Sequence, residues 1–452
     1  FNVAADFVLP LEYGDGRALD IIFGGGYTVT NREAERRDFV FSGAYPQEIL
    51  GSRADLIFSD EILSLTGPRV TLQSTRSQPD NFEGSMQVGA AYIGADIELG
   101  DYLRAAVGGR FEDSKQKTRT FATIDPQNNA FTQYPTLQEE FLLPSVTLTW
   151  IPSFTQTSEL FGETDIQLRL GYSETITRPQ FRELTAVRFE DPDVDIVYSG
   201  NPFLEHTRIK NYDARLAMYF ARGEFATIGF FFKEFDKPIE DFFSTQGEAS
   251  VQSFANAPSA ELWGVELELE KNFDLAEIIE SEWAFGKDLV FKTNYTYSDS
   301  RIQVEDTDVL IRALNTPAGV DDDVVPANAF IRDGSPITGQ SDHLFNLQLG
   351  IADNDSGTTA TALVNYASER ILYRNEGLQP AITENPPISL DFVVNQNVDL
   401  FGAEYSLGVK FQNILNDRYE ALQETGRNDV VEVPFETYDL GRTVSVSLKR
   451  TF

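Results

Sequence analysis

Long segments in which apolar and polar residues alternate are the feature that most restricts the fold of this chain. Every second side chain is apolar in residues 165–173, with Ile166, Leu168 and Leu170, and in residues 264–270, with Val265, Leu267 and Leu269. Successive side chains of a strand point to opposite faces, so each segment predicts a strand with one apolar face. Many such segments reach the roughly 9 to 11 residues that cross a bilayer at a tilt, whereas strands of soluble proteins have about 5 to 6. The pattern favours a membrane-spanning β-barrel over a soluble sandwich.

The connections between these segments alternate between two lengths. Short turns are predicted at residues 98–104, 220–226, 352–359 and 399–405, and long polar loops at residues 44–85, 185–208, 303–342 and 423–436. Outer-membrane barrels have short turns at the periplasmic rim and longer loops at the extracellular rim. The alternation of lengths therefore predicts that architecture.

The composition argues against several other classes of protein. Asp and Glu total 71 against 36 Lys and Arg, a net charge of −35, and phosphate binding needs a basic surface, so no nucleic-acid partner is expected. The absence of cysteine excludes disulfides and thiolate metal sites, and the two histidines, His206 and His343, give little support to a histidine metal centre or a Ser-His-Asp triad. The sequence has no run of about 18 apolar residues, so no transmembrane helix is expected. No carboxylate spacing names a reaction, so we do not expect an enzyme.

About fifteen strands can be counted. Their centres lie near residues 6, 28, 93, 112, 145, 170, 215, 229, 264, 293, 348, 364, 393, 410 and 445. An odd number of antiparallel strands cannot close into a barrel, because the first and last strands would be parallel neighbours. Unpaired edges in lipid cost several kcal/mol for each backbone group. The fold class is therefore all-β, a transmembrane antiparallel β-barrel, and we expect residues 1–452, which begin with Phe1, to be the C-terminal portion of a larger barrel domain.

Four segments resemble the barrel of TonB-dependent outer-membrane receptors: residues 172–184, 199–220, 223–243 and 254–273. Residues 408–420 look like the penultimate-strand motif of that family, which Asn413, Ile414, Asn416 and Tyr419 match. The last strand, with Val444, Val446, Leu448 and Phe452, is similar to the C-terminal signal that the barrel-assembly machinery reads.

The resemblance implies a barrel of about 22 strands with a plugged lumen. It implies that residues 1–452 lack the N-terminal plug and the first strands. It also implies an outer-membrane receptor of a Gram-negative bacterium, with a periplasmic C-terminus, which takes up a scarce nutrient such as a ferric siderophore or a carbohydrate with energy from TonB. The expected partners are outer-membrane lipid, TonB through the plug, the barrel-assembly machinery and a surface lipoprotein. No cofactor is implied.

The loop at residues 185–208 is the best candidate for contact with substrate, because aromatic and polar side chains together can stack on rings and hydrogen-bond to them. The candidate residues are Arg188, Phe189, Glu190, Asp191, Asp193, Tyr198, Asn201 and Phe203. The alternative is an ordinary turn at Gly200, Asn201 and Pro202. Beside this loop, Arg178 and Arg182 are expected to pair with Glu174 and Glu183 or to line the lumen.

Two further groups of acidic residues are expected to lie in different surroundings. Glu266, Glu268 and Glu270 are expected to face the lumen, since they would be costly in lipid. The acidic loops at residues 189–195, 321–323 and 384–387 are either solvated surface or sites for calcium.

Two other functions remain open from the sequence. A porin or adhesin-type barrel without a plug would have the same alternation. A barrel-assembly client captured partly folded would also present a C-terminal set of strands.

Overall fold

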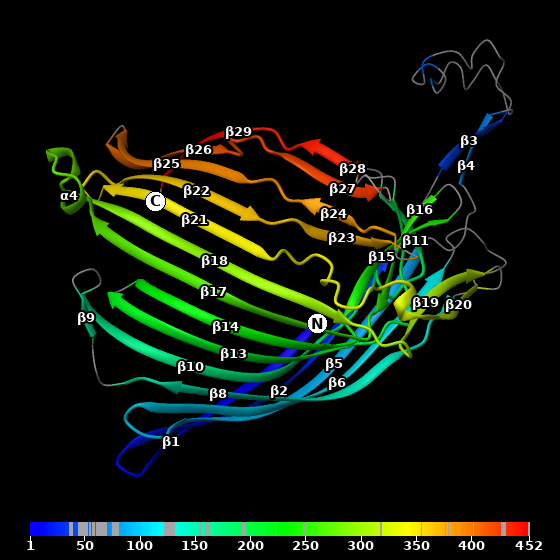
Figure 1. The fold of residues 1–452 in the computed structure, drawn as a ribbon, viewed down its shortest axis with the longest axis horizontal. Helices are drawn as coiled ribbons and strands as arrows, with labels where there is room; N and C mark the ends of the chain where they lie inside the picture. The colour runs from blue at the N-terminus through cyan, green and yellow to red at the C-terminus, as the bar shows by residue number, and fades with distance from the viewer. Residues whose placement is uncertain are drawn as a thin grey trace.

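The structure is a computed structural model of an almost all-β chain. It describes residues 1–35, 39–43, 53, 56, 59, 70–74, 81–121, 132–152, 156–158, 162–191, 196–221, 223–246, 249–316, 319–353, 355–375, 377, 379–400, 402–425 and 431–450. Fifteen long strands form one curved sheet (Figure 1). The strands are β1 (Asn2–Tyr13), β2 (Arg17–Ala34), β5 (Asn81–Glu98), β6 (Leu103–Phe121), β8 (Leu137–Trp150), β10 (Gly162–Thr177), β13 (Thr207–Ala221), β14 (Glu224–Asp236), β17 (Ser259–Asp274), β18 (Lys287–Gln303), β21 (His343–Asp353), β22 (Thr358–Ala367), β25 (Ser389–Leu400), β26 (Ala403–Gln412) and β29 (Thr443–Lys449).

Each strand of this sheet pairs with the next one along the chain, and every pair is antiparallel. All fifteen strand centres expected from the sequence lie inside these strands, so the predicted fold class is confirmed. Within the described residues, β1 pairs only with β2 and β29 only with β26, so the sheet is open between them. The short connections lie at one rim and the long ones at the other (Figure 1).

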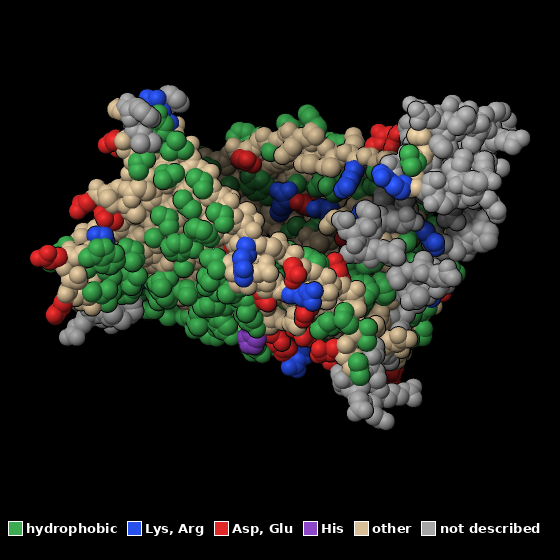
Figure 2. All heavy atoms as spheres, turned by 90° about the horizontal axis from the view of Figure 1, so that it is seen from above, with side chains coloured by type: hydrophobic (Ala, Val, Ile, Leu, Met, Phe, Trp, Pro, Cys, Tyr) green, Lys and Arg blue, Asp and Glu red, His purple; other side chains and the backbone are tan. Residues whose placement is uncertain are grey.

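One face of the sheet is apolar and faces outward. Leu170, Phe230 and Leu267, on three different strands, are 45%, 53% and 44% exposed. Large apolar side chains in such numbers are unfavourable in water, so this face contacts lipid. We call the fifteen-stranded sheet the wall. In Figure 2 the apolar side chains form a broad patch on the wall, whereas Lys, Arg, Asp and Glu gather near the two rims and inside the hollow.

Aromatic residues mark both edges of the apolar face. The edge nearer the long loops consists of Tyr172, Tyr212, Phe232, Trp263, Tyr297 and His343, one on each of six strands. Four neighbouring pairs of these rings have centroids 5.1 to 5.9 Å apart. At the other edge, Lys271 Nζ lies 5.9 Å from the rings of both Phe220 and Phe273.

The spacing of the two edges fits a bilayer. Trp263 and Phe273 lie on the same strand, β17, at opposite edges. Their separation of about ten residues, at about 3.3 Å per residue and a tilt of about 40°, spans roughly 25 Å, the height of the apolar band of an outer-membrane barrel.

The long connections form a second, smaller sheet outside this band. Its eight strands follow the order β11-β12-β16-β15-β23-β24-β27-β28, and two of its pairings, β12 with β16 and β15 with β23, are parallel. The bounds are β11 (Arg188–Asp191), β12 (Ile196–Ser199), β15 (Ile239–Gln246), β16 (Ala249–Asn256), β23 (Arg370–Asn375), β24 (Ile382–Asn385), β27 (Arg418–Thr425) and β28 (Val431–Asp439). We call these strands and the loops that join them the loop layer.

Most fully buried apolar side chains of the described residues lie in or beside the loop layer. One cluster contains Phe242, Ile302, Leu310 and Ile331, and another contains Ile196, Phe243, Ile382 and Ala421. The hydrophobic core therefore holds the loops together, while the wall below them presents its apolar side chains to lipid.

The remaining elements are short. They are β3 (Phe39–Gly43) paired with β4 (Val70–Ser74), β7 (Thr132–Gln133), β9 (Gln156–Ser158), the hairpin β19 (Val309–Thr316) and β20 (Gly319–Pro326), the helix α4 (Leu275–Ile278), and the 3₁₀ turns η2 (Glu282–Ala284) and η3 (Ala327–Ala329). In the part of the chain that the structure describes, no helix has the length and apolar character needed to cross a membrane.

The motif at Asn413–Asn416 has a conformational cause. Asn413 and Asn416 have φ values of 51° and 54°, in the left-handed region that asparagine tolerates better than most residues. Asn413 Nδ2 donates to the carbonyl of Gly441 at 2.8 Å, and its backbone N–H donates to Asp391 Oδ1 at 2.8 Å. The two asparagines therefore turn the chain sharply at the end of β26 and fasten it beside β29.

Replacing Leu267 by lysine tests the outward face. Because Leu267 lies near the middle of the band, a lysine there should destabilise the folded wall by about 2–4 kcal/mol. The control is Asn294→Lys, since Asn294 is exposed on the opposite face, where its register partner is Glu268. The measurement is the midpoint of urea unfolding in lipid, followed by the shift of the folded band in SDS gels. Equal midpoints for the two variants would contradict the assignment of the faces.

Candidate functional site

The inner face of the sheet carries charged side chains in opposite-charge pairs. Glu268 Oε2 lies 3.1 Å from Arg215 Nη2, and Glu270 pairs with Lys292 on the next strand. These partners lie on the face opposite Leu267, in agreement with the expected lumenal orientation of the glutamate row. Such a wall suits contact with water or with a polar protein surface.

Two depressions in the sheet are lined by polar side chains. One, of about 350 Å³, is lined by Thr147, Arg169, Gly171, Asp213, Ala214, Arg215, Gly229, Phe230, Phe231, Lys233 and Glu266. The other, of about 650 Å³, lies nearer the loops and is lined by residues of β2, β5 and β6 together with Gln133. Both mix cationic and anionic groups, so neither selects a ligand by net charge alone.

A buried ion pair holds the loop layer together. Glu240 is completely buried, and its carboxylate accepts hydrogen bonds from Arg374 Nε at 2.6 Å and from the backbone N–H of Thr338 at 3.2 Å. Arg374 also donates to Ser335 Oγ at 3.0 Å and to the carbonyl of Pro336. Since both charges are satisfied by several partners, the pair fixes β15, β23 and the loop at 335–338 relative to one another.

The candidate ligand loop folds into this layer. Arg188–Asp191 form β11, which pairs with the strand that contains Tyr198. The side chains of Phe189, Glu190 and Asp191, and the whole of Asp193, lie outside the described residues. The structure therefore gives the backbone path of the first three and no geometry for the fourth.

Asn201 fastens that loop to its neighbours. Its side chain is completely buried, and Nδ2 donates to the carbonyls of Phe254 at 2.9 Å and Ile311 at 2.7 Å. Its Oδ1 accepts the backbone N–H of Phe203 at 3.0 Å. The amide is thus engaged on both sides in positioning three segments, and Phe203 next to it is half-buried.

Five residues form a mixed aromatic and charged group, which we call the loop cluster: Arg182, Glu183, Tyr198, Asp241 and Tyr373. Arg182 is exposed, and its guanidinium lies 4.6 Å from the centre of the Tyr198 ring. Burial and the neighbouring Tyr198 raise the pKa of Tyr373. An exposed guanidinium backed by an aromatic face is able to bind a planar or anionic ligand.

The two carboxyl groups of the loop cluster, Asp241 and Glu183, have pKa values above their ordinary ones. Burial raises the pKa of Asp241, against a hydrogen bond from Gln252 Nε2 at 3.1 Å and the charge of Arg182. Burial also raises the pKa of Glu183, which accepts the backbone N–H of Gln180 at 2.8 Å and feels the negative charge of Asp241. Sequence reasoning missed Asp241 and Tyr373 as site residues, because no local pattern links positions so far apart in the chain.

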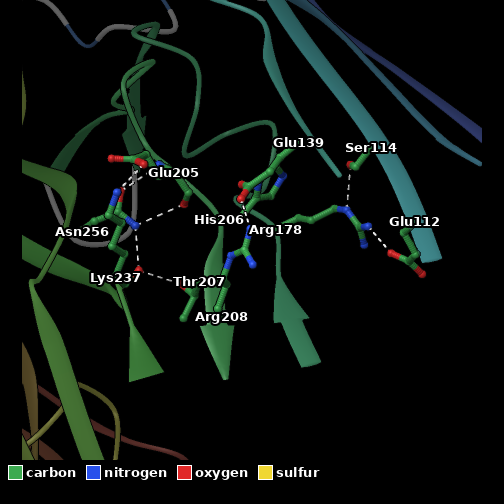
Figure 3. A network of polar contacts seen from close by, with 10 residues as sticks. All are labelled: Glu112, Ser114, Glu139, Arg178, Glu205, His206, Thr207, Arg208, Lys237 and Asn256. Carbon is green, nitrogen blue, oxygen red and sulfur yellow. Dashed lines mark hydrogen bonds and ion pairs between the residues drawn. The ribbon is translucent and has the colours of Figure 1, made fainter. Parts of the chain in front are cut away.

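The expected partner of Arg178 was wrong. Its guanidinium pairs with Glu112 and donates from Nε to Ser114 Oγ at 2.9 Å (Figure 3). Glu174 instead accepts the hydroxyl of Tyr172 at 2.6 Å. The physical reason is the path of the chain: β10 ends at Thr177, and the next residues lie against β6, where Gln116 Nε2 donates to the carbonyl of Pro179 at 2.8 Å.

His206 lies at the point where the loop rejoins the wall. Its ring is buried, and Nδ1 lies 3.0 Å from Glu139 Oε2 (Figure 3). The ring also contacts Phe141 edge-on, with the ring centroids 5.1 Å apart. Its Nε2 has no hydrogen-bond partner among the described residues. Burial lowers the pKa of His206, while Glu139 acts in the opposite direction.

The last described strand exposes a row of valine and leucine. Val444, Val446 and Leu448 on β29 are 63%, 70% and 57% exposed, and Phe452 lies outside the described residues. In the described ranges no group of three or more His, Asp or Glu is arranged to hold a metal ion, and calcium binding by the acidic loops stays a prediction.

Comparison with protein families matches residues 5–427 to the model described as TonB dependent receptor-like, beta-barrel. The chain belongs to the TonB-dependent receptor family. Receptors of this family are outer-membrane transport proteins and not enzymes. No curated protein sequence matches the chain.

Solved structures of TonB-dependent receptors share the fold. The siderophore receptor PiuA from Acinetobacter baumannii has 12% identity and a TM-score of 0.57 over 99% of this chain and 55% of its own. The ferric yersiniabactin uptake receptor FyuA from Yersinia pestis has 13% identity and a TM-score of 0.55, over 100% of this chain and 54% of its own. A double mutant of the hemophore receptor HasR of Serratia marcescens was solved with its hemophore HasA and heme. It has 13% identity and a TM-score of 0.51, over 92% of this chain and 56% of its own. The chain thus spans little more than half the length of these proteins.

Breaking the buried ion pair should loosen the loop layer of this receptor without unfolding its wall. Glu240→Gln leaves the Arg374 charge uncompensated, at a cost of about 3–5 kcal/mol. Limited proteolysis should then cut the loop layer rapidly while the folded band in SDS gels persists. The double variant Glu240→Met with Arg374→Met leaves no buried charge and should recover much of the resistance, whereas equal sensitivity of both variants would contradict this role.

The opening of the segment at His206 should depend on pH. Because its folded-state pKa is lowered below the ordinary value of 6.5, the opened state takes up a proton first as the pH falls. The stability of this segment is therefore full above about pH 6.5 and declines as the pH falls toward the folded-state pKa.

Hydrogen exchange of peptides covering residues 200–208, corrected for the intrinsic pH dependence of exchange, measures this opening. His206→Gln carries no titrating ring, so its opening should stay constant between pH 7.5 and pH 5. The same slope in both proteins would assign the pH dependence to another group.

Proposed function

We propose that this chain is part of an outer-membrane receptor that takes up a scarce, chelated nutrient, a ferric siderophore being the leading candidate, with energy from the TonB complex. The observation that carries the proposal is the match of the receptor-barrel family over residues 5–427. The substrate class is supported by the structural neighbours, which include a siderophore receptor and a ferric yersiniabactin uptake receptor. A carbohydrate is the alternative substrate.

The loop cluster supplies the chemistry for capture. Ferric chelates commonly present aromatic or anionic donor groups on a compact surface, and Arg182 over the Tyr198 ring offers a cation and a π-face together. Arg182 places a positive charge beside Asp241 and Glu183 in a chain that as a whole is strongly acidic, which favours an anionic ligand at this point.

The inner wall supports coupling to TonB. Its paired charges, such as Arg215 with Glu268, suit a polar protein surface inside the lumen, and the family carries its TonB-contacting plug there. We further propose that Val444, Val446, Leu448 and Phe452 serve as the signal for the barrel-assembly machinery. Among the described residues β29 pairs only with β26, so its other backbone edge is open to strand pairing beside an exposed apolar row.

Uptake of radioactive iron tests the proposed function. A strain that lacks the receptor gene should lose energised uptake of one ferric chelate from a panel, and the complete gene should restore it in a TonB-positive strain only. Uptake that continues without TonB would contradict the active-transport proposal and favour a porin. Loss of sugar uptake with normal iron uptake would reassign the substrate.

Binding to variants of the complete receptor locates the site. Arg182→Ala should weaken chelate binding about tenfold or more, because a charge-assisted contact contributes about 1.5 kcal/mol or more. Arg301→Ala is the matched control, since Arg301 is also exposed but pairs with Asp299 on the outward face. Equal affinities for the two variants would remove the loop cluster from the site.

A further inference from the structure

The connection between β17 and β18 differs from the other connections at the short-turn rim. It contains α4 and η2 and lies at the left of Figure 1, beside the turn between β21 and β22. Four large apolar side chains of this connection are exposed: Ile278 by 54%, Ile279 by 45%, Trp283 by 56% and Phe285 by 67%. Single exposed apolar residues are ordinary, but four within eight residues mark a contact surface.

The backbone of this connection is held by caps. Asp274 Oδ1 accepts the backbone N–H of Ala276 at 2.9 Å at the start of α4, and Ser281 Oγ accepts that of Trp283 at 3.3 Å at the start of η2. Leu275 and Ala284 are buried beneath them. The segment ends at Gly286, whose φ of 71° favours glycine. The apolar side chains are therefore presented by an ordered scaffold.

Lys287 holds the exposed tryptophan in place. Its Nζ donates to the carbonyl of Trp283 at 2.8 Å and lies 5.2 Å from the centre of the indole ring. The same Nζ lies 3.4 Å from Asp353 Oδ2 on the neighbouring turn. The charge of Lys287 is thus neutralised within the rim, which leaves the outer surface of Trp283 as an apolar contact.

The apolar surface continues a series around the same rim. Leu99 and Tyr102 in the turn between β5 and β6 are 48% and 47% exposed, and Trp150 and Ile151 at the end of β8 are 41% and 45% exposed. The lipid-facing wall ends just above it at Phe273. Aromatic girdles of this kind lie at the two membrane interfaces of outer-membrane barrels, where tryptophan is favoured.

We propose that residues 275–286 form a membrane anchor that lies in the headgroup region of the lipid leaflet at the short-turn rim. Ile278, Ile279, Trp283 and Phe285 contact phospholipid, continuous with the lipid-facing wall. Glu277 directly precedes these residues, and Glu280 and Glu282 lie among them, so the anchor prefers zwitterionic over anionic lipid. This inference rests on the membrane-spanning wall and not on the transported substrate.

The fluorescence of Trp283 tests the anchor. The complete receptor is prepared with Trp283 as its one tryptophan, all others being replaced by phenylalanine, and is inserted in bilayers of phosphatidylcholine brominated at a shallow or a deep chain position. The folded band in SDS gels shows that each variant retains its wall. A second protein with Trp263 as its one tryptophan is the control for the opposite girdle.

The expected result is that Trp283 emits at short wavelength, loses most of its emission in shallow-brominated lipid, and is protected from acrylamide in water to the same degree as Trp263. Replacing part of the lipid by phosphatidylglycerol should reduce the quenching by bromine, and Glu277→Gln with Glu280→Gln and Glu282→Gln should remove that reduction. Free quenching by acrylamide without quenching by bromine would overturn the proposal and leave the surface to a periplasmic protein. Quenching that is insensitive to phosphatidylglycerol would overturn the lipid preference.

Discussion

Backbone groups that lie in lipid must be hydrogen-bonded within the protein, and the rest of this structure depends on that constraint. Fifteen successive antiparallel strands satisfy it by pairing each strand with the next along the chain. Once the backbone is paired, the alternation of side chains along each strand determines which residues contact lipid. Leu170, Phe230 and Leu267 lie on the face toward lipid. Arg215 and Glu268 lie on the inner face. The aromatic edges then fix the height of the wall in the membrane.

Above the lipid the constraint changes, since water can satisfy exposed backbone groups. The loops there form a layer with its own core, with parallel as well as antiparallel pairs, and with the buried pair of Glu240 and Arg374 at its centre. A rigid layer of this kind is able to hold Arg182, Tyr198 and Asp241 in one arrangement, as selective capture of a compact ligand requires. In the function that we propose, the loop layer recognises the ligand, and the wall supports the layer and encloses the passage.

The sequence predicted the wall well because each of its strands is specified locally. Alternation located all fifteen strands, and the charge of Glu266, Glu268 and Glu270 indicated which face is inside. The sequence could not predict the loop layer. Its pairs of β12 with β16 and of β15 with β23 join loops that are distant along the chain, and no periodicity in the sequence indicates such contacts. The pairing of Arg178 with Glu112 instead of Glu174 has the same cause: the path of the chain after β10 is decided by tertiary contacts. Residues 275–286 were missed since the segment has neither strand alternation nor a long helical period.

The alternation of lipid and lumen along β17 is the central claim, and spin labels placed one at a time at positions 263 to 271 of the complete receptor in bilayers test it most directly. The chain has no cysteine of its own, so each introduced cysteine is specific within it. The account predicts that odd positions collide with oxygen, which concentrates in lipid, more than with a water-soluble nickel complex, and that even positions show lower ratios. A smooth profile, or one with even positions in lipid, would contradict the arrangement of the wall from which every other conclusion follows.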